Sequence, residues 1–423
     1  MPGVLYKEKG SSGVVYPPDW SQIGYSDTPD STLRGFNYAL DILENWDVSQ
    51  VVHTEEYRYN YNLMYFPANI NPVNLETIDR MFQGSNLEYI DIDLTYTRTA
   101  QSLFADCHNL RSARVYNAGV NANLVSLNNM FIECHGLVGI IFDDQHLQPN
   151  TYMQNFCKNC YELPSFSYGF LNPHDRVVNA SGAFENCYKM QILNFIDGIC
   201  KNIGCYSIGR DTSTGCQCNI NIGANTTGVE FSFDGAAKIA GTSTISLNNV
   251  STAQNGFRGS TIKLGASISV LGSAVNCTAM FKNASIESNV TLNVDEVSNA
   301  LQMFDGLTLA GTNTTLDLSN IDFGTCANFK NAFSNMTHCN NITFPSGYIF
   351  TSATDLQDCF SSTAGLSNTC VDNILDQLAH ASTYSGTKTL AHLGFTSANY
   401  PAATIQSLNN YSAFTTAGWT IGY

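Results

Sequence analysis

A repeated motif constrains this chain more than any other feature of its sequence. In the segment N-N-M-F-I-E-C-H-G-L-V-G-I-I-F (128–142), a Phe, a Cys and a Leu follow one another at intervals of three residues. Two further apolar residues then come three and five positions after the Leu. Leu110 and Met190 have the same Phe and Cys before them and the same pair of apolar residues after them. Part of this pattern occurs around Leu87, Leu163 and Cys339. Such internal repetition predicts a repeat architecture before any single residue is considered.

The spacing within the motif predicts its local structure. The two apolar residues after the Leu alternate with polar ones, which indicates a strand with one buried face. The Phe and Cys, three residues apart, favour a short helical or 3₁₀ turn packed inward. Because one unit cannot cover its own apolar face, units must stack, each burying its Phe, Cys and Leu against the next. Successive anchors at 82, 104, 131, 157 and 184 are 22, 27, 26 and 27 residues apart, and a second series follows at 257, 281, 304, 333 and 360.

These segments resemble a known repeat family. S-G-A-F-E-N-C-Y-K-M (181–190) and N-N-M-F-I-E-C-H-G-L (128–137) resemble the BspA-like leucine-rich repeat of bacterial surface antigens. A-L-Q-M-F (300–304) and L-D-L-S-N-I-D-F (316–323) resemble a related repeat of mycoplasma lipoproteins, and the tail A-G-W-T-I-G-Y resembles the end of such arrays in bacteriophage and bacterial surface proteins. The resemblance implies a leucine-rich-repeat solenoid, β-rich with short helical turns, that serves as a binding scaffold.

The composition excludes several classes of protein. The chain has 19 basic and 35 acidic residues, a net charge of −16 that disfavours nucleic acid and anionic membranes as partners. No segment has the ~18 apolar residues needed to span a bilayer. Residues 1–10 lack a basic segment followed by an apolar one, so we expect no conventional export signal.

The fourteen cysteines predict buried free thiols rather than disulfides or zinc. Cys107, Cys134, Cys160 and Cys187 occupy one position of the repeat, as a column of small core residues would. Cys157-x-x-Cys160 and Cys216-x-Cys218 have spacings compatible with zinc, but the first follows from the repeat and the second places both thiols on one face of a strand. We therefore expect no metal and no cofactor.

The segment before the repeats predicts an attachment region. Residues 1–30 contain aromatic residues, Trp20 among them, and no periodicity, which is typical of an extended arm. Residues 31–46 predict a helix, either a solenoid cap or an oligomer contact. Its apolar stripe comprises Leu33, Phe36, Leu40 and Leu43. We expect residues 1–50 to mediate attachment and oligomerisation, with a trimer favoured.

The remaining chain divides into four parts. Leucine-rich repeats are expected over 51–200 and 251–380, separated by degenerate β-rich repeats over 201–250, where 216–222, 229–233 and 243–247 predict short strands. The pattern of residues 371–380 predicts a helix that buries Val371, Ile374, Leu375 and Leu378. Residues 381–423 are the expected C-terminal cap.

No catalytic motif is evident, so we expect a protein that is not an enzyme. His135 and His338 lie within repeats and are interpreted as turn residues rather than bases. Asp91 and Asp93 lie on one face of a predicted strand, where paired carboxylates serve glycoside cleavage or calcium binding in other proteins, but solvated outward residues are the simpler interpretation. The candidate ligand-binding residues are those predicted to point outward from the sheet: Tyr89, Asp91, Asp93, Arg114, Ser165, Ser167 and Asn194.

These features favour a structural protein of a tailed-bacteriophage virion, a head or tail fibre or appendage assembled in the host cytoplasm. Its arm would bind other virion proteins, and its repeats would bind a host-surface glycan or protein. The alternatives are a bacterial cell-surface adhesin and, less favoured, a polysaccharide depolymerase.

Overall fold

The computed structural model of the chain describes residues 77–116, 124–142, 151–169, 179–198, 203–222, 231–312 and 314–423, together with 7–8 and 46–47. The chain divides into two compact units, Met1–Asp211 and Thr212–Tyr423. The described residues form about nine turns of a parallel β-solenoid, with little helix. The predicted solenoid is therefore confirmed, whereas the α/β arrangement of leucine-rich repeats is not shown.

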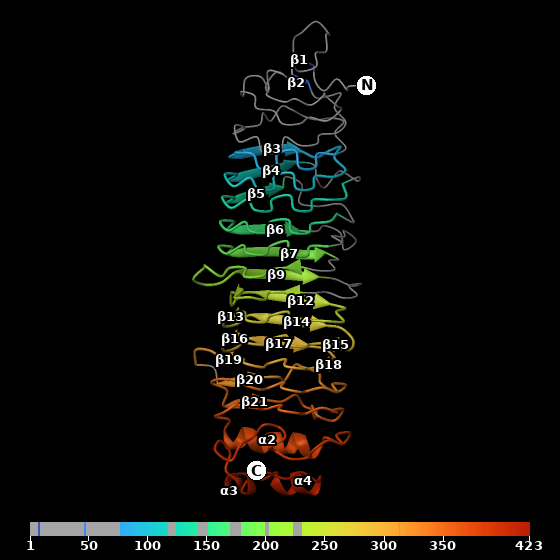
Figure 1. Cartoon of the computed structure of the whole chain (residues 1–423), viewed down its shortest axis with the longest axis vertical. Helices are drawn as coiled ribbons and strands as arrows, with labels where there is room; N and C mark the ends of the chain where they lie inside the picture. Colours follow the sequence, from blue (N-terminus) through green and yellow to red (C-terminus); the bar gives the residue numbers. More distant parts are fainter. Residues whose placement is uncertain are drawn as a thin grey trace, which may run out of the picture. The chain divides into compact units, whose positions relative to one another are not determined.

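The first unit contains two sets of parallel strands (Figure 1). In one set, β3 (Tyr89–Asp93) pairs with β4 (Ser112–Tyr116), and β4 pairs with β5 (Gly139–Phe142). In the other, β6 (Ser165–Gly169) pairs with β7 (Ile192–Gly198). The unit also contains the antiparallel pair β1 (Lys7–Glu8) and β2 (Trp46–Asp47), and the short strand β8 (Ile203–Gly204).

The second unit stacks its strands in the same way. One sheet has the order β17-β14-β12-β9 and another the order β11-β13-β16-β19, while β15 pairs with β18 and β20 with β21, all parallel. The strands are β9 (Gln217–Ile222), β10 (Phe231–Ser232), β11 (Lys238–Ile239), β12 (Thr244–Asn248), β13 (Thr261–Ile262), β14 (Ser267–Leu271), β15 (Val275–Asn276), β16 (Ser285–Ile286), β17 (Thr291–Val294), β18 (Val297–Asn299), β19 (Thr308–Leu309), β20 (Thr315–Asp317) and β21 (Asn341–Thr343). Strands β9, β10 and β12 confirm the short strands predicted in the loosely repeated region.

A column of phenylalanine rings forms the centre of each unit. In the first unit, Phe131 stacks on Phe104 with ring centroids 5.4 Å apart, and both rings are fully buried. In the second, six rings stack in succession at 5.2–5.7 Å. They belong to Phe233, Phe257, Phe281, Phe304, Phe333 and Phe360. The repeat position predicted to be core is therefore core, although Ile140, also predicted to be buried, is only half-buried.

The segment around each Phe is not the helical turn that its spacing predicted. Residues two before and two after the Phe have positive φ, as at Asn129 (56°) and Glu133 (61°) around Phe131. A right-handed helix cannot include such residues, and Asn and Asp are among the few non-glycine residues that tolerate this conformation. Alternate backbone N–H groups instead donate to the next coil, as Phe131 N–H does to Phe156 O at 2.9 Å. The turns are thus hydrogen-bonded along the stack, as the strands are.

The cysteines form a second column beside the rings. The thirteen described cysteines are free and buried, as predicted. The thiol of Cys134 donates to the carbonyl of Phe104 in the preceding coil at 3.0 Å, and those of Cys107 and Cys160 do the same to Phe82 and Phe131. Thr363 occupies the same position in a later coil, and its hydroxyl donates to Phe333 O at 2.5 Å. In these four coils the position therefore holds a donor, thiol or hydroxyl, that bonds to the preceding coil.

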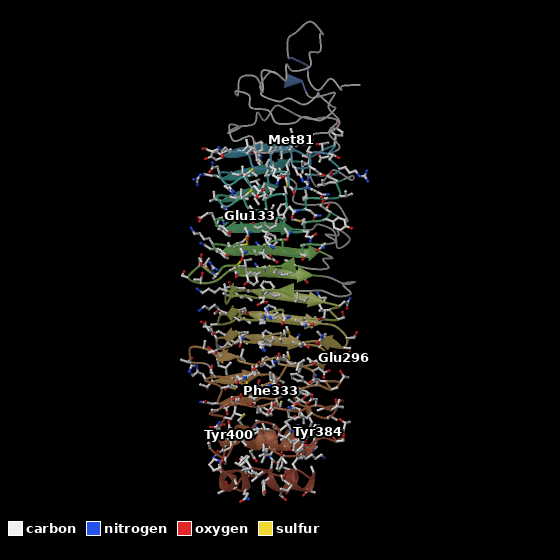
Figure 2. All side chains as sticks on the ribbon, viewed as in Figure 1. Met81, Glu133, Glu296, Phe333, Tyr384 and Tyr400 are labelled. Atoms are coloured by element: carbon white, nitrogen blue, oxygen red, sulfur yellow. The ribbon has the colours of Figure 1, made fainter. Side chains whose placement is uncertain are left out.

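Helices close the C-terminal end of the second unit. The predicted helix is confirmed as α2 (Asn368–Ala379), whose residues Val371, Ile374, Leu375 and Leu378 are buried. Ser367 caps it, because its side chain accepts from the N–H of Cys370. Helices α3 (Ala402–Gln406) and α4 (Tyr411–Thr416) contact α2. Tyr400, which Figure 2 labels, donates its hydroxyl proton to Thr363 O at 2.8 Å.

The predicted attachment residues lie outside the described residues. This holds for Trp20, Leu33, Phe36, Leu40 and Leu43. Of the helix predicted over residues 31–46, only Trp46 is described, and it belongs to β2. Among the described residues, no helix is long and apolar enough to cross a membrane.

Candidate functional site: the outward faces of the strands

Strands β3 and β4 bring together four of the predicted ligand-binding residues. Tyr89 is 51 % exposed, Asp91 and Asp93 are half-buried and Arg114 is exposed. The register pairs Asp91 with Arg114 on adjacent strands, where opposite charges attract. Tyr89, Asp91 and Arg114 therefore form one charged and aromatic patch.

Asp93 has a structural role at the end of β3. Its Oδ1 accepts hydrogen bonds from the Thr95 N–H at 2.9 Å and from the Thr95 hydroxyl at 2.5 Å. This arrangement closes the turn that ends the strand, as aspartate commonly does. The two carboxylates of this strand therefore differ, since Asp91 lies beside an arginine and Asp93 holds a turn.

The other three predicted residues lie on a separate pair of strands. Ser165 and Ser167 are exposed on β6, and Asn194 is half-buried on β7. Asn194 lies opposite Ser167 in the register and donates from Nδ2 to its Oγ at 2.9 Å. The structure thus divides the predicted set into a charged patch on β3 and β4 and a neutral patch on β6 and β7.

The second unit has a larger outward face, which our candidate residues did not include. Strands β9, β12, β14 and β17 align their outward residues in rows, because every coil keeps the same register. One row is Asn219, Thr244, Ser267 and Thr291, and the next is Asn221, Ser246, Ser269 and Asn293. Both rows consist of uncharged hydroxyl and amide side chains. Neighbouring members are about 4.8 Å apart along the row, the ordinary separation of strands.

A stack of aromatic rings runs along the surface of the first unit. His108, His135, Tyr161 and Tyr188 stack at centroid distances of 4.6, 4.6 and 5.1 Å, and the guanidinium carbon of Arg210 lies 3.7 Å from the centroid of Tyr188. Each ring follows a cysteine of the thiol column, a signal that was present in the sequence. Because the faces of the inner rings contact one another, this stack offers its edges to a ligand rather than a free ring face.

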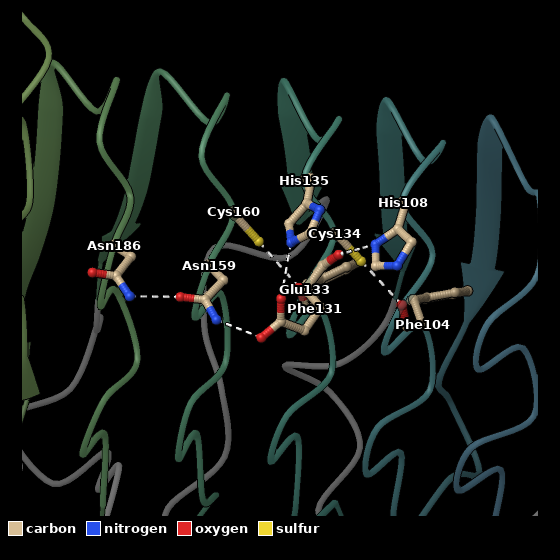
Figure 3. Close-up of polar contacts among 9 residues, drawn as sticks. All are labelled: Phe104, His108, Phe131, Glu133, Cys134, His135, Asn159, Cys160 and Asn186. Carbon is tan, nitrogen blue, oxygen red and sulfur yellow. Dashed lines mark hydrogen bonds and ion pairs between the residues drawn. The ribbon is translucent and has the colours of Figure 1, made fainter.

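Both histidines in this stack are held by Glu133 (Figure 3). Nδ1 of His108 lies 2.8 Å from Glu133 O, and since a carbonyl only accepts, this nitrogen carries the proton. Nε2 of His135 lies 2.8 Å from a carboxylate oxygen of Glu133. The same carboxylate accepts from Asn159, and Asn186 donates to Asn159 at 2.7 Å. His135 thus stabilises a turn, whereas His338, with a φ of 59°, lies in a bend.

The described residues contain no group of three or more His, Cys, Asp or Glu side chains placed to hold a metal ion. Comparison of the chain with protein families, characterised proteins and solved structures finds no match.

Proposed function

We propose that this chain is a binding scaffold without catalytic activity, a structural protein of a tailed-bacteriophage virion whose outward strand faces bind a host-surface glycan or protein. The observation that carries the proposal is the pair of aligned neutral rows on β9, β12, β14 and β17. Solenoids with such constant register provide extended binding surfaces. Hydroxyl and amide groups can both donate and accept, so these rows suit an uncharged polar partner.

The helices at the C-terminal end of the array support its role as a scaffold. Helices α2, α3 and α4 cover the last coil, and the backbone of Phe360 donates to Leu393 O within this cap. Terminal capping elements with a polar outer face keep a solenoid soluble. Under the proposal, residues 1–50 attach the protein, as a trimer, to other virion proteins.

Binding to host cells tests the scaffold. The full-length protein, labelled with a fluorophore, is titrated against host cells and against purified host envelope. One variant carries Tyr89→Ala and Arg114→Ala in the first unit, and another carries Ser246→Arg and Ser269→Arg in the second. Ser382→Arg is the matched control, because Ser382 is exposed but lies outside the strands.

We expect one face variant to weaken binding by at least about tenfold, or about 1.4 kcal/mol, and the control to bind normally. The variant that loses binding identifies the face. Normal binding by both face variants, or no binding by the unmodified protein, would refute the scaffold. Mass spectrometry of purified particles tests the location: peptides found in host envelope instead of particles would favour the cell-surface adhesin.

A further inference from the structure

Two neighbouring coils of the second unit differ in length at one corner. Ile286 pairs with Leu309 in the next coil, and Val294 pairs with Ile321. Val294 follows Ile286 by eight positions in the first coil, whereas Ile321 follows Leu309 by twelve positions in the next. The longer coil must therefore leave the stack between these two fixed points.

The extra residues separate β20 from β17. Within the described chain, β17 ends its sheet and β20 pairs with β21 instead. Thr291 N–H donates to Ala266 O on the side of β14, so the next residue, Leu292, directs its backbone groups toward the longer coil. Directly after β20, Leu318 N–H donates to Thr343 O, so Asp317, the last residue of β20, directs its backbone groups toward β17. Backbone hydrogen-bonding groups from both strands thus face the gap.

The gap is a pocket of about 210 Å³, in which the buried lining residues are aliphatic, here called its floor, and the polar lining residues are more exposed, here called its rim. Its apolar lining residues are Ile286, Val290, Leu292, Leu309 and Leu316. Its polar lining residues are Glu287, Ser288, Asn289, Thr315, Asp317 and Thr343. The volume lies below the roughly 300–1,000 Å³ of pockets that hold drug-sized ligands, so one small ring is the largest group it can take.

The charges at the rim disfavour an anion. Lys263 Nζ lies 2.6 Å from Glu287 Oε1, and Glu287 Oε2 accepts the Leu264 N–H at 3.1 Å. The hydrogen bond from Lys263 lowers the pKa of Glu287, so this carboxylate stays ionised and neutralises the lysine. Asp317 accepts the Ser319 N–H through Oδ1 at 3.0 Å, which leaves its second oxygen for a ligand. The rim is therefore negative overall, with hydroxyl and amide groups beside a single available carboxylate.

We infer that this pocket binds one neutral sugar residue of a glycan. A sugar ring combines C–H surfaces, which match the aliphatic floor, with hydroxyl groups that both donate and accept. Asp317 can accept from such a hydroxyl, while Ser288, Asn289 and Thr343 can do either. The inference rests on the proposed function, because it names the class of host-surface ligand that the scaffold would hold.

A blocking substitution and a matched control test the pocket. Ser288→Trp places an indole on the rim. Leu264 occupies the same corner one coil earlier, since Ile262 pairs with Ile286 and Ser267 with Thr291. Leu264 does not line the pocket and is 52 % exposed, so Leu264→Trp adds the same side chain without blocking it. Asp317→Asn removes the charge and keeps an oxygen that can accept the Ser319 N–H.

The measurement is ligand-observed NMR titration of the full chain with methyl glycosides of glucose, galactose, mannose and N-acetylglucosamine. Glucuronate and butylamine serve as the anionic and cationic probes. We expect at least one neutral glycoside to bind with a dissociation constant on the order of 1 mM, the weak end of the affinity scale. Ser288→Trp and Asp317→Asn should each weaken it by at least about tenfold, and Leu264→Trp should not.

The inference is overturned if no neutral glycoside binds, if Ser288→Trp and Asp317→Asn both bind it normally, or if glucuronate or butylamine binds more tightly. Thermal melting checks the fold of each variant, and if Ser288→Trp does not fold, Asp317→Asn decides. The two proposals also fail separately. Glycoside binding without binding to host cells would refute the scaffold, whereas host binding that both pocket variants retain after losing the glycoside would refute the pocket as the site of the host glycan.

Discussion

Replacing Phe131 by alanine tests the packing on which the solenoid depends. The ring of Phe131 is fully buried, lies 5.4 Å from the ring of Phe104 in one neighbouring coil and meets the ring of Phe156 edge-on at 5.3 Å in the other. The substitution therefore leaves a cavity bounded by two other rings. Its backbone N–H and C=O keep their partners, so the loss is confined to side-chain packing.

The expected cost follows from these contacts. Truncation of a packed Phe to Ala costs about 3–5 kcal/mol, through lost transfer free energy and the residual cavity. Each aromatic pair adds about 0.5–1.5 kcal/mol beyond burial, and two pairs are lost here. We expect the upper half of the range, about 4–5 kcal/mol, because the hydrogen-bonded turns above and below restrain collapse of the cavity.

Urea denaturation followed by circular dichroism measures the loss, and native-state hydrogen exchange locates it. In a solenoid each coil contacts only its neighbours, so protection should fall first around Phe104, Phe131 and Phe156. Ile141→Ala is the control: its side chain is 52 % exposed, and surface changes usually fall within about 0.5 kcal/mol. A loss below about 1 kcal/mol for Phe131→Ala, or one equal to that of the control, would refute the packing argument.

Three further predictions concern the thiol column and the turns. Burial raises the pKa of Cys107 to about 11, so its thiol stays neutral in the fold while the unfolded thiol ionises from about pH 8.5. The contribution of Cys107 to stability should therefore be constant below that pH and be lost as pH rises toward 11, measured as the urea midpoint, and an unchanged midpoint at pH 10 would contradict this. Thr363→Val removes the donor to Phe333 O and the acceptor of the Met336 N–H, and should cost about 1–3 kcal/mol by the same assay, whereas Thr363→Cys should restore much of it. Asn159→Ala should lower the free energy of unfolding by about 1–3 kcal/mol, because Asn159 has a φ of 63° and two side-chain hydrogen bonds. Asn159→Gly should lower it less, since glycine adopts positive φ without strain. Equal melting temperatures for the two variants would show that backbone strain is unimportant there.

The repeat made the core predictable, since residues at one position of a stack share one environment. Phe104 and Phe131 were assigned to neighbouring coils from spacing alone, and the structure confirms the pair. Helix α2 was also predictable, because its apolar residues recur at helical spacing without a competing pattern. Both predictions rest on periodicity: the spacing of repeat units for the two phenylalanines, and the helical spacing within a few residues for α2.

The turn conformation was mispredicted because a spacing of three fits two structures. Phe131 and Cys134 could lie on one helical turn or on successive β-turns, and Cys134 N–H does donate to Phe131 O in the structure. The deciding residues are those beside the Phe, such as Asn129, whose positive φ a helix forbids. The frequent Asn and Gly at these positions carried that information in the sequence.

The pocket could not be predicted residue by residue, because it arises from a difference between two coils. The interval from Phe304 to Phe333 is 29 residues, against 23 from Phe281 to Phe304, so the sequence does indicate a longer coil. It does not indicate where the extra residues leave the stack. That depends on which strand pairs are kept, here Ile286 with Leu309 and Val294 with Ile321.

The same separation of core from surface explains why the outward faces are the place to expect specificity. Phe, Cys and Leu positions satisfy their packing and their donors within the stack, as Cys134 does with Phe104 O. Outward residues such as Ser246 and Ser269 contribute little to that stack, so they can differ between coils without loss of the fold. The first unit uses this freedom for the charged pair Asp91 and Arg114, and the second for uncharged rows. Each unit therefore carries its own pattern of outward residues, encoded without changing the core.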